Sequence, residues 1–393
     1  MIPLRGLLGR LALSAVAVAA TVALVELGFA LFAPQPFAVG AAETMDRDPH
    51  VGYRLRPGSV SRLHRGILAH VNGQGFRDSE VGPREPGTLR ILAIGDSFTF
   101  GTNVADDEPY PQVLESLLAA SARRPVEVIN TGVPGWGPVQ YAAFYEHDGR
   151  ALAPDLVLVG VYVGNDAYSP HRRIGQVRLT AVSGHRVRKA AAGDPLLPWK
   201  LFLYDHSHLF RLVRNRTQLA SPDFRRARCD DFSPAVVELE RGYLRVHRRR
   251  GPQAARAMAA VVQNLTNIDR LARGDGIPTL VVLIPDEMQV HPALRDAVLG
   301  KRPRGGYDFS MPQSQLADEL ERRDVEVVDL LPDLRTADFC LHMNDIHWTP
   351  EAHHLAAEVL LREIERRFPD LGSPRPLEAP SSRRATAAAQ SAR

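Results

Sequence analysis

Apolar runs alternate along the chain with segments that have helical spacing. We expect buried strands at residues 89–94, 126–130, 154–163, 279–284 and 325–330. Apolar residues recur every three or four positions in the segments between them, at residues 111–120, 140–152, 254–273 and 314–323. A last helix is expected after Thr349, which can cap it, with Pro350 in its first turn. Strands that alternate with helices predict an α/β fold with a parallel sheet.

The amino-terminal pattern differs, because residues 11–33 are apolar apart from Glu26. This stretch is long enough to cross a bilayer. Arg5 and Arg10 precede it and no arginine follows closely, so residues 1–10 are expected in the cytoplasm and the rest outside. A cleaved signal sequence, with small residues at 38–42, is the alternative; the length favours an uncleaved anchor. Glu26 would have to snorkel, stay protonated or pair with another helix.

Three further segments lack sustained periodicity. Residues 34–87 are rich in Pro, Gly and Arg, and we expect a connector of short strands that packs on the main domain, with a flexible stalk as the alternative. The main domain is expected at residues 88–368, interrupted at about 168–233 by an insertion or lid. Residues 369–393 are rich in Pro, Ser, Ala and Arg and are predicted to be disordered.

Charge and composition exclude several classes of function. The formal net charge is only +3, and the run Arg248–Arg250 has no interleaved aromatic residues, so it indicates a solvated helix face and no nucleic-acid partner. The sequence has no phosphate loop and no dinucleotide fingerprint. His353 and His354 are adjacent in a predicted helix and cannot both face one ion, so no metal and no cofactor are expected.

The chain has two cysteines, Cys229 and Cys340. They are too few for a disulfide framework, but one bridge is possible if the domain is exported. Such a bridge could pin the segment around His347, seven residues after Cys340. Two unpaired buried thiols are the alternative.

Chemistry-bearing residues follow the first three strands and occur once more near the carboxyl end. The turn Gly95-Asp96-Ser97 follows the first strand, and a serine on such a turn is where an α/β fold exposes a nucleophile. Gly135 lies in the glycine-rich turn after the second strand, and Asn165 follows the third. The last patch contains His347, which the final loop would return to the carboxyl ends of the strands, so it is the candidate general base.

In this order the four patches resemble the SGNH (GDSL-type) family of serine esterases and acyltransferases, from about residue 89 to residue 368. The resemblance implies a flavodoxin-like, three-layer α/β/α domain. It implies that Ser97 is the nucleophile and His347 the base. The oxyanion would be bound by the backbone N–H groups of Ser97 and Gly135 and by the side-chain amide of Asn165.

The acid of the triad departs from the pattern of the family. Many members carry Asp three residues before the histidine, where this chain has Asn344. Asp345, two residues before, would reach the imidazole of His347 if the loop is extended. Asp333 and Asp338 are lesser alternatives. The Asp-x-His-Trp spelling is similar to that of alginate-type O-acetyltransferases.

We therefore expect an exported serine esterase, anchored by its amino-terminal helix, with its catalytic domain in the periplasm or outside the cell. It would hydrolyse acyl esters, acetyl esters first among them, of a saccharide or a small molecule. The alternatives are an O-acyltransferase that modifies a cell-envelope or exported polysaccharide, and a non-catalytic envelope binding protein. Trp348, beside the base, is a candidate for stacking on a sugar, as are Trp199, Phe202 and Tyr204, although all four could equally be core residues.

Overall fold

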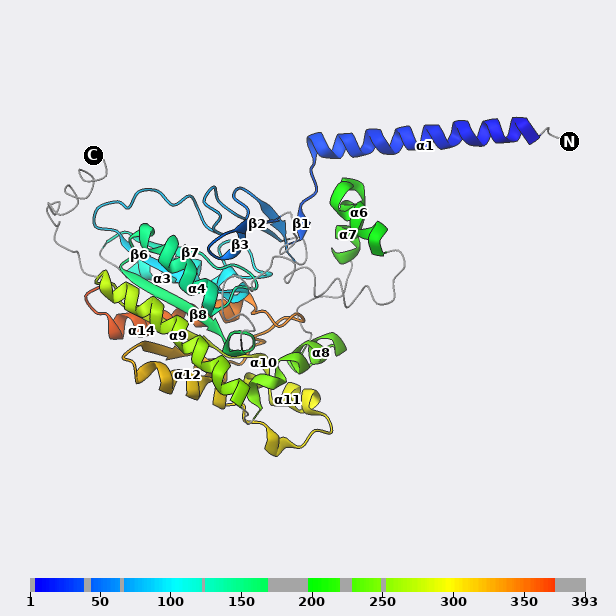
Figure 1. Ribbon diagram of the computed structural model, residues 1–393. Helices are drawn as coiled ribbons and strands as arrows, with labels where there is room; N and C mark the ends of the chain where they lie inside the picture. The colour runs from blue at the N-terminus through cyan, green and yellow to red at the C-terminus, as the bar shows by residue number, and fades with distance from the viewer. Residues whose placement is uncertain are drawn as a thin grey trace.

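A parallel five-stranded sheet forms the centre of the fold in the computed structural model (Figure 1), which describes residues 4–38, 44–63, 67–121, 124–168, 197–219, 228–248 and 252–371. Its strands are β6 (Leu89–Ile94), β7 (Val126–Asn130), β8 (Leu156–Tyr162), β9 (Thr279–Ile284) and β10 (Glu326–Asp329). They lie in the order β10-β9-β8-β6-β7, and every neighbouring pair is parallel. The predicted α/β fold with a parallel sheet is confirmed.

Helices cover both faces of the sheet, which explains why β6, β8 and β9 are buried throughout and are apolar except for Arg90 in β6 and Thr279 in β9. One face packs against α3 (Tyr110–Ser121) and α14 (Pro350–Arg367). The other packs against α4 (Pro138–His147), α9 (Pro252–Gly274) and α12 (Met311–Glu321). Helix α14 begins as expected, with the Thr349 hydroxyl accepting a hydrogen bond from the N–H of Ala352. The result is a three-layer α/β/α domain.

The strand order sets the place where a ligand would bind. The first strand of the sheet, β6, lies between β7 and β8, so the chain passes to one side of it and then to the other. This arrangement has the flavodoxin-like order 2-1-3-4-5, in which ligands bind at the carboxyl ends of strands 1 and 3. Residues directly after β6 and β8 therefore flank the expected crevice.

The connector forms two small sheets that belong to the folded body. Strands β2 (Met45–Asp48) and β3 (Gly52–Leu55) pair as an antiparallel hairpin, and β1 (Phe37–Ala38), β4 (Val60–Arg62) and β5 (Leu68–His70) form a three-stranded sheet. Tyr53 and Leu55 belong to the same buried cluster as α4 and α9. The indole Nε1 of Trp136 donates to the carbonyl of Tyr53 over 2.8 Å. The hairpin thus packs against the loop between β7 and α4.

Helix α1 (Leu4–Phe32) contains a candidate membrane span, Gly9–Phe32, by its length and apolar composition. A membrane anchor and a signal sequence both fit this description. Its side chains after the first turn are mostly exposed, and Figure 1 shows the helix extending away from the sheet domain. The small residues 39–42 of the possible cleavage region lie outside the described residues.

Several elements after the third strand were not predicted in detail. The described part of the expected insertion contains α6 (Leu197–His206) and α7 (His208–Leu219), while residues 169–196 and 220–227 lie outside the described residues. Four further helices follow: α8 (Pro234–Tyr243), α10 (Glu287–Val290), α11 (Pro292–Leu299) and α13 (Leu331–Leu334). Of these, α10 and α13 span only four residues each, too few for a clear helical period. Of the tail predicted to be disordered at 369–393, residues 369–371 form a turn with Leu371 buried, and the rest lies outside the described residues.

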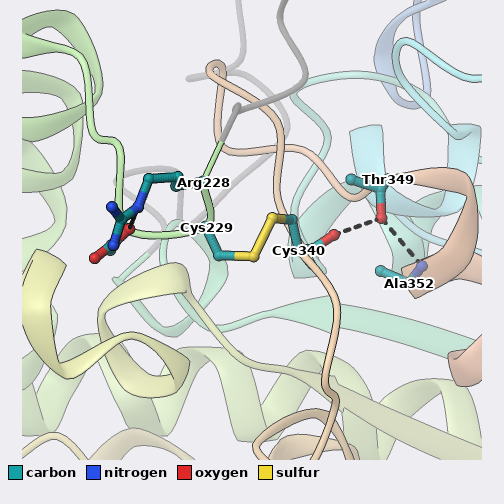
Figure 2. The surroundings of a disulfide bond; sticks show 6 residues. Arg228, Cys229, Cys340, Thr349 and Ala352 are labelled. Atoms are coloured by element: carbon teal, nitrogen blue, oxygen red, sulfur yellow. Dashed lines mark hydrogen bonds and ion pairs between the residues drawn. A yellow bond between two sulfur atoms is a disulfide. The ribbon is translucent and has the colours of Figure 1, made fainter.

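Cys229 and Cys340 form a disulfide (Figure 2). The bridge ties the segment before α8 to the loop that leads to His347. The carbonyl of Cys340 also accepts a hydrogen bond from the hydroxyl of Thr349 over 2.9 Å, so the bridge is linked to the start of α14. Of the two alternatives that the sequence leaves open, the structure shows the bridged one.

Removal of this bridge by Cys229→Ala is expected to lower the free energy of unfolding by about 2–4 kcal/mol, because the bridge closes a long loop in the unfolded chain. The separation of the two cysteines is 111 residues. The thermal midpoint of the full chain in detergent would report the loss. Wild type treated with reductant should show a similar decrease, and the variant should not respond to reductant. An unchanged midpoint in the variant would contradict a stabilising bridge.

Candidate active site

Three segments converge on the turn Gly95-Asp96-Ser97 at the carboxyl end of β6. The backbone N–H of Val133, from the loop after β7, donates to the carbonyl of Gly95 over 3.1 Å. The side-chain amide of Asn165, after β8, donates to Asp96 Oδ2 over 3.1 Å. Ser97 Oγ lies 2.9 Å from His347 Nε2. Gly95, Asp96 and Ser97 are therefore each hydrogen-bonded to a different segment: the loop after β7, the turn after β8 and the loop that carries His347.

Ser97 is the first residue of the four-residue helix α2 (Ser97–Phe100). The carboxylate of Asp96 caps this helix by accepting a hydrogen bond from the N–H of Phe98. Gly95 is required by close packing, because a Cβ at this position would lie 1.9 Å from Thr99 Oγ1. Asp96 and Phe98 are buried, whereas Ser97 is partly exposed. The local sequence thus presents the serine at the sheet edge where the strand order places a ligand.

His347 has a carboxylate partner on its other ring nitrogen. Asp345 Oδ2 lies 3.0 Å from His347 Nδ1, and Asp345 Oδ1 accepts a hydrogen bond from the backbone N–H of His347 over 3.2 Å. Ser97, His347 and Asp345 therefore form a continuous chain of hydrogen bonds. The alternative acid Asp333 instead forms an ion pair with Arg362.

The reason that Asp345 reaches the imidazole differs from the prediction. The segment is a tight turn and not an extended loop, since the N–H of Met343 donates to the carbonyl of His347 over 2.8 Å. Ile346, between the acid and the base, has a φ of +73°. A β-branched residue rarely adopts this left-handed conformation, so the turn is strained where it presents His347.

Asn103 is a site residue that the sequence did not reveal. Its side-chain amide donates a hydrogen bond to Asp345 Oδ2, the oxygen that faces His347. Asn103 itself has a φ of +71°, a conformation that asparagine tolerates better than most residues. The sequence shows only that an asparagine follows the candidate nucleophile by six residues. It does not show that this asparagine contacts Asp345, which lies 242 positions further along the chain.

The predicted oxyanion donors lie on segments that contact the nucleophile turn. Among the described residues, no group accepts a hydrogen bond from the backbone N–H of Ser97 or of Gly135. Gly135 has a φ of +82°, which favours glycine. The amide of Asn165 donates one hydrogen bond to Asp96, and its second N–H remains for a ligand. Oxyanion binding by these groups remains a prediction.

Two buried carboxyl groups support this edge of the sheet. Burial raises the pKa of both Asp96 and Asp166, and the nearby charge of Asp96 raises the pKa of Asp166 further. Asp166 Oδ2 accepts hydrogen bonds from the Tyr141 hydroxyl over 2.9 Å and from the N–H of Tyr162 over 3.2 Å. These bonds fix the turn that carries Asn165.

Trp348 does not have the surface that sugar stacking would require. Its side chain is 0% exposed and belongs to the core between the sheet, α3 and α14. Its ring packs edge-on against Phe98, with ring centroids 5.2 Å apart. The expectation of a substrate contact is corrected: Trp348 supports the residue next to Ser97 from within the core.

Glu287, His291 and His342 bring one potential metal-ligand atom each to within 4.8 Å of one another. The sequence predicted no metal, and these residues come from α10, its carboxyl cap and the distant loop before His347. One carboxylate and two imidazoles suit a divalent transition metal. None of the three residues is without an interaction partner. No step of the mechanism below involves this cluster.

A model of the GDSL-like lipase/acylhydrolase family matches residues 93–293, just over half of the 393 residues. The chain belongs to this family. It is a hydrolase that acts on ester bonds, as the motifs predicted. The matched segment contains Ser97, Gly135 and Asn165, whereas Asp345 and His347 follow it.

Solved structures of the GDSL-like family are similar only at a distance. A lipase/acylhydrolase from Enterococcus faecalis is 13% identical, with a TM-score of 0.38, over 73% of this chain and 99% of its own. A GDSL-like lipase from Bacteroides thetaiotaomicron is 10% identical, with a TM-score of 0.33, over 71% and 89%. The acetyl xylan esterase AlAXEase is 10% identical, with a TM-score of 0.38, over 70% and 100%. No curated protein sequence matches the chain significantly.

Proposed function

We propose that this member of the GDSL-like family is an exported serine esterase in which Ser97, His347 and Asp345 form the catalytic triad. The observation that carries the proposal is the unbroken chain from Ser97 Oγ to His347 Nε2, 2.9 Å, and from His347 Nδ1 to Asp345 Oδ2, 3.0 Å. Both distances lie within hydrogen-bonding range.

The first half-reaction transfers the acyl group to the enzyme. Ser97 Oγ attacks the ester carbonyl carbon while its proton passes to His347 Nε2. The negative charge that develops on the carbonyl oxygen is bound by the N–H groups of Ser97 and Gly135 and by the amide of Asn165. The ester C–O bond then breaks, and the leaving alcohol takes the proton from His347. Asp345 stabilises the imidazolium between these two transfers.

The second half-reaction returns Ser97 to its resting state. A water molecule gives a proton to His347 Nε2 and attacks the acyl carbon. The bond to Ser97 Oγ breaks, the serine regains its proton from His347, and a carboxylic acid leaves. A sugar hydroxyl in place of water would make the same enzyme an O-acyltransferase. The Asp345-x-His347-Trp348 motif favours the O-acyltransferase, and membership of the GDSL-like lipase/acylhydrolase family favours the esterase.

Two features support a location outside the cytoplasm. Helix α1 contains an apolar span preceded by arginine and can serve as an anchor. The Cys229–Cys340 disulfide is typical of proteins in oxidising compartments and rare in the cytoplasm. An exported esterase of this kind would meet acyl esters of envelope saccharides, and acetyl esters are the substrates that we propose.

Product analysis with p-nitrophenyl acetate separates the two candidates. We expect acetate to be released at the same rate with and without an added oligosaccharide, because water resolves the acyl-enzyme. Acetate and acetylated sugar would be quantified by mass spectrometry, with Ser97→Ala as the blank. Formation of acetylated oligosaccharide at the expense of free acetate would contradict hydrolysis and identify a transferase.

A further inference from the structure

Glu26, the single acid within the apolar span, contacts the hairpin formed by α6 and α7. Its carboxylate accepts hydrogen bonds from the Ser207 hydroxyl, from the N–H of His208 over 2.8 Å and from the N–H of Leu209 over 3.2 Å. These donors lie at the beginning of α7, where a helix has backbone N–H groups without partners in its own first turn. A carboxylate that would be costly in lipid alone is therefore matched by donors of the hairpin.

The segment that leaves α1 is joined to the same hairpin. The N–H of Gln35 donates to His208 Nδ1 over 2.9 Å, and Arg211 Nε donates to the carbonyl of Gln35 over 3.1 Å. A second nitrogen of Arg211 donates to the carbonyl of Tyr204 and so connects α7 to α6. Figure 1 shows α6 and α7 below the carboxyl-terminal end of α1. The hairpin is thus fixed to the place where the span ends.

The hairpin exposes large apolar side chains that water does not favour. Among the large apolar side chains described outside α1, the four most exposed are those of Trp199 at 67%, Val213 at 55%, Phe202 at 52% and Leu203 at 40%. Tryptophan and other aromatic residues concentrate where a bilayer meets water. The sequence of the same two helices contains Lys200, Arg214 and Arg216 besides Arg211, and only one acid, Asp205. That balance suits anionic lipid headgroups.

The length of α1 places the start of α7 near the edge of the hydrocarbon layer of the bilayer. A span of 24 residues, Gly9–Phe32, is ~36 Å long, compared with about 30 Å of hydrocarbon. Its last turn therefore extends into the headgroup region. Glu26 lies ~9 Å before Phe32, close to the edge of the hydrocarbon, so α7 begins near that edge.

We propose that the α6–α7 hairpin is a lipid-binding element that inserts Trp199 and Phe202 into the interface of the bilayer crossed by α1, with Glu26 as the clamp between hairpin and anchor. The partner is the bilayer surface, and its anionic headgroups bind the basic residues of the hairpin. This inference rests on the membrane anchor of the proposed function and is independent of the triad. Two points of attachment would hold the catalytic domain in a fixed orientation to the membrane.

Tryptophan fluorescence tests the proposal without labelling. The chain has three tryptophans, and Trp136 and Trp348 are only 2% and 0% exposed, so Trp199 is the one placed to meet lipid. The full chain would be reconstituted in vesicles of phosphatidylcholine and phosphatidylglycerol that carry bromine either near the headgroup or deep in the acyl chain. We expect stronger quenching by the shallow bromine, and loss of that quenching in Trp199→Phe.

Glu26 provides the matched variants. Glu26→Leu makes α1 more apolar and removes the clamp, so the chain should stay in the membrane while shallow quenching of Trp199 falls at least twofold. Glu26→Gln keeps an acceptor oxygen and should retain more of the quenching. Resistance to carbonate extraction would be measured on each sample. Retention in the membrane without quenching of Trp199 in wild type would overturn this inference alone. Extraction of wild type would overturn the anchor and this inference together, whatever the esterase activity.

Discussion

Ser97→Ala is expected to lower kcat for ester hydrolysis by about 10⁵-fold to 10⁶-fold, which is the scale of nucleophile removal in serine hydrolases. The variant lacks the only atom that can form the acyl-enzyme. The fold should survive, because the Ser97 hydroxyl has one hydrogen-bond partner among the described residues, His347 Nε2. Helix α2 is capped by Asp96 and not by Ser97. Steady-state hydrolysis of p-nitrophenyl acetate would report the loss.

The matched control for this variant is Ser116→Ala. Ser116 is an exposed serine of α3 whose hydroxyl, within the described parts of the chain, bonds only to the carbonyl of Gln112, one turn earlier. Its replacement should leave both kcat and the thermal midpoint unchanged. Activity of Ser97→Ala within tenfold of wild type, in a protein with an unchanged midpoint, would contradict Ser97 as the nucleophile.

Asp345→Asn is expected to lower kcat by about 10³-fold to 10⁴-fold, as loss of the triad anion does in serine proteases. Both carboxylate oxygens of Asp345 face donors: Oδ1 the N–H of His347, and Oδ2 its ring and the amide of Asn103. An amide nitrogen in either position would therefore meet another N–H. The substitution removes the anion that stabilises the imidazolium and also disturbs the turn. Single-turnover kinetics would show slow acylation.

Asn344→Ala is the control for the acid, because Asn344 occupies the position where many family members carry the triad carboxylate. We expect a mild effect, within about tenfold, since Asn344 is not the residue that contacts His347 Nδ1. If Asn344→Ala were severe and Asp345→Asn mild, the assignment of the acid would be wrong.

The sheet could be predicted from the sequence because each strand is buried on both faces. Residues 89–94 and 279–284 are apolar apart from Arg90 and Thr279, and they form β6 and β9 with the predicted bounds. The helices that follow long 3.6-residue periods, α9 and α14, were also predictable. Helices α10 and α13 were not, since each spans only four residues and depends on caps and tertiary contacts rather than on a period.

The site was only partly predictable for a different reason. Ser97 and Asn165 directly follow strands of a parallel sheet, whose carboxyl ends lie at one edge. The strained φ of Ile346 and the bond from Asn103 to Asp345 depend on how distant segments meet, and no local pattern encodes them. The role of Glu26 could not be predicted for the same reason. Its hydrogen-bond donors lie at the start of α7, far away in the sequence.

Covalent labelling tests the central claim most directly, because it requires an activated serine and not merely an exposed one. The full chain in detergent would be treated with a fluorophosphonate probe, and the adduct would be located by peptide mass spectrometry. We predict a single adduct on Ser97, none in Ser97→Ala, and markedly slower labelling in Asp345→Asn. Folded wild-type protein that remains unlabelled, or that carries its adduct on another residue, would contradict the proposed triad.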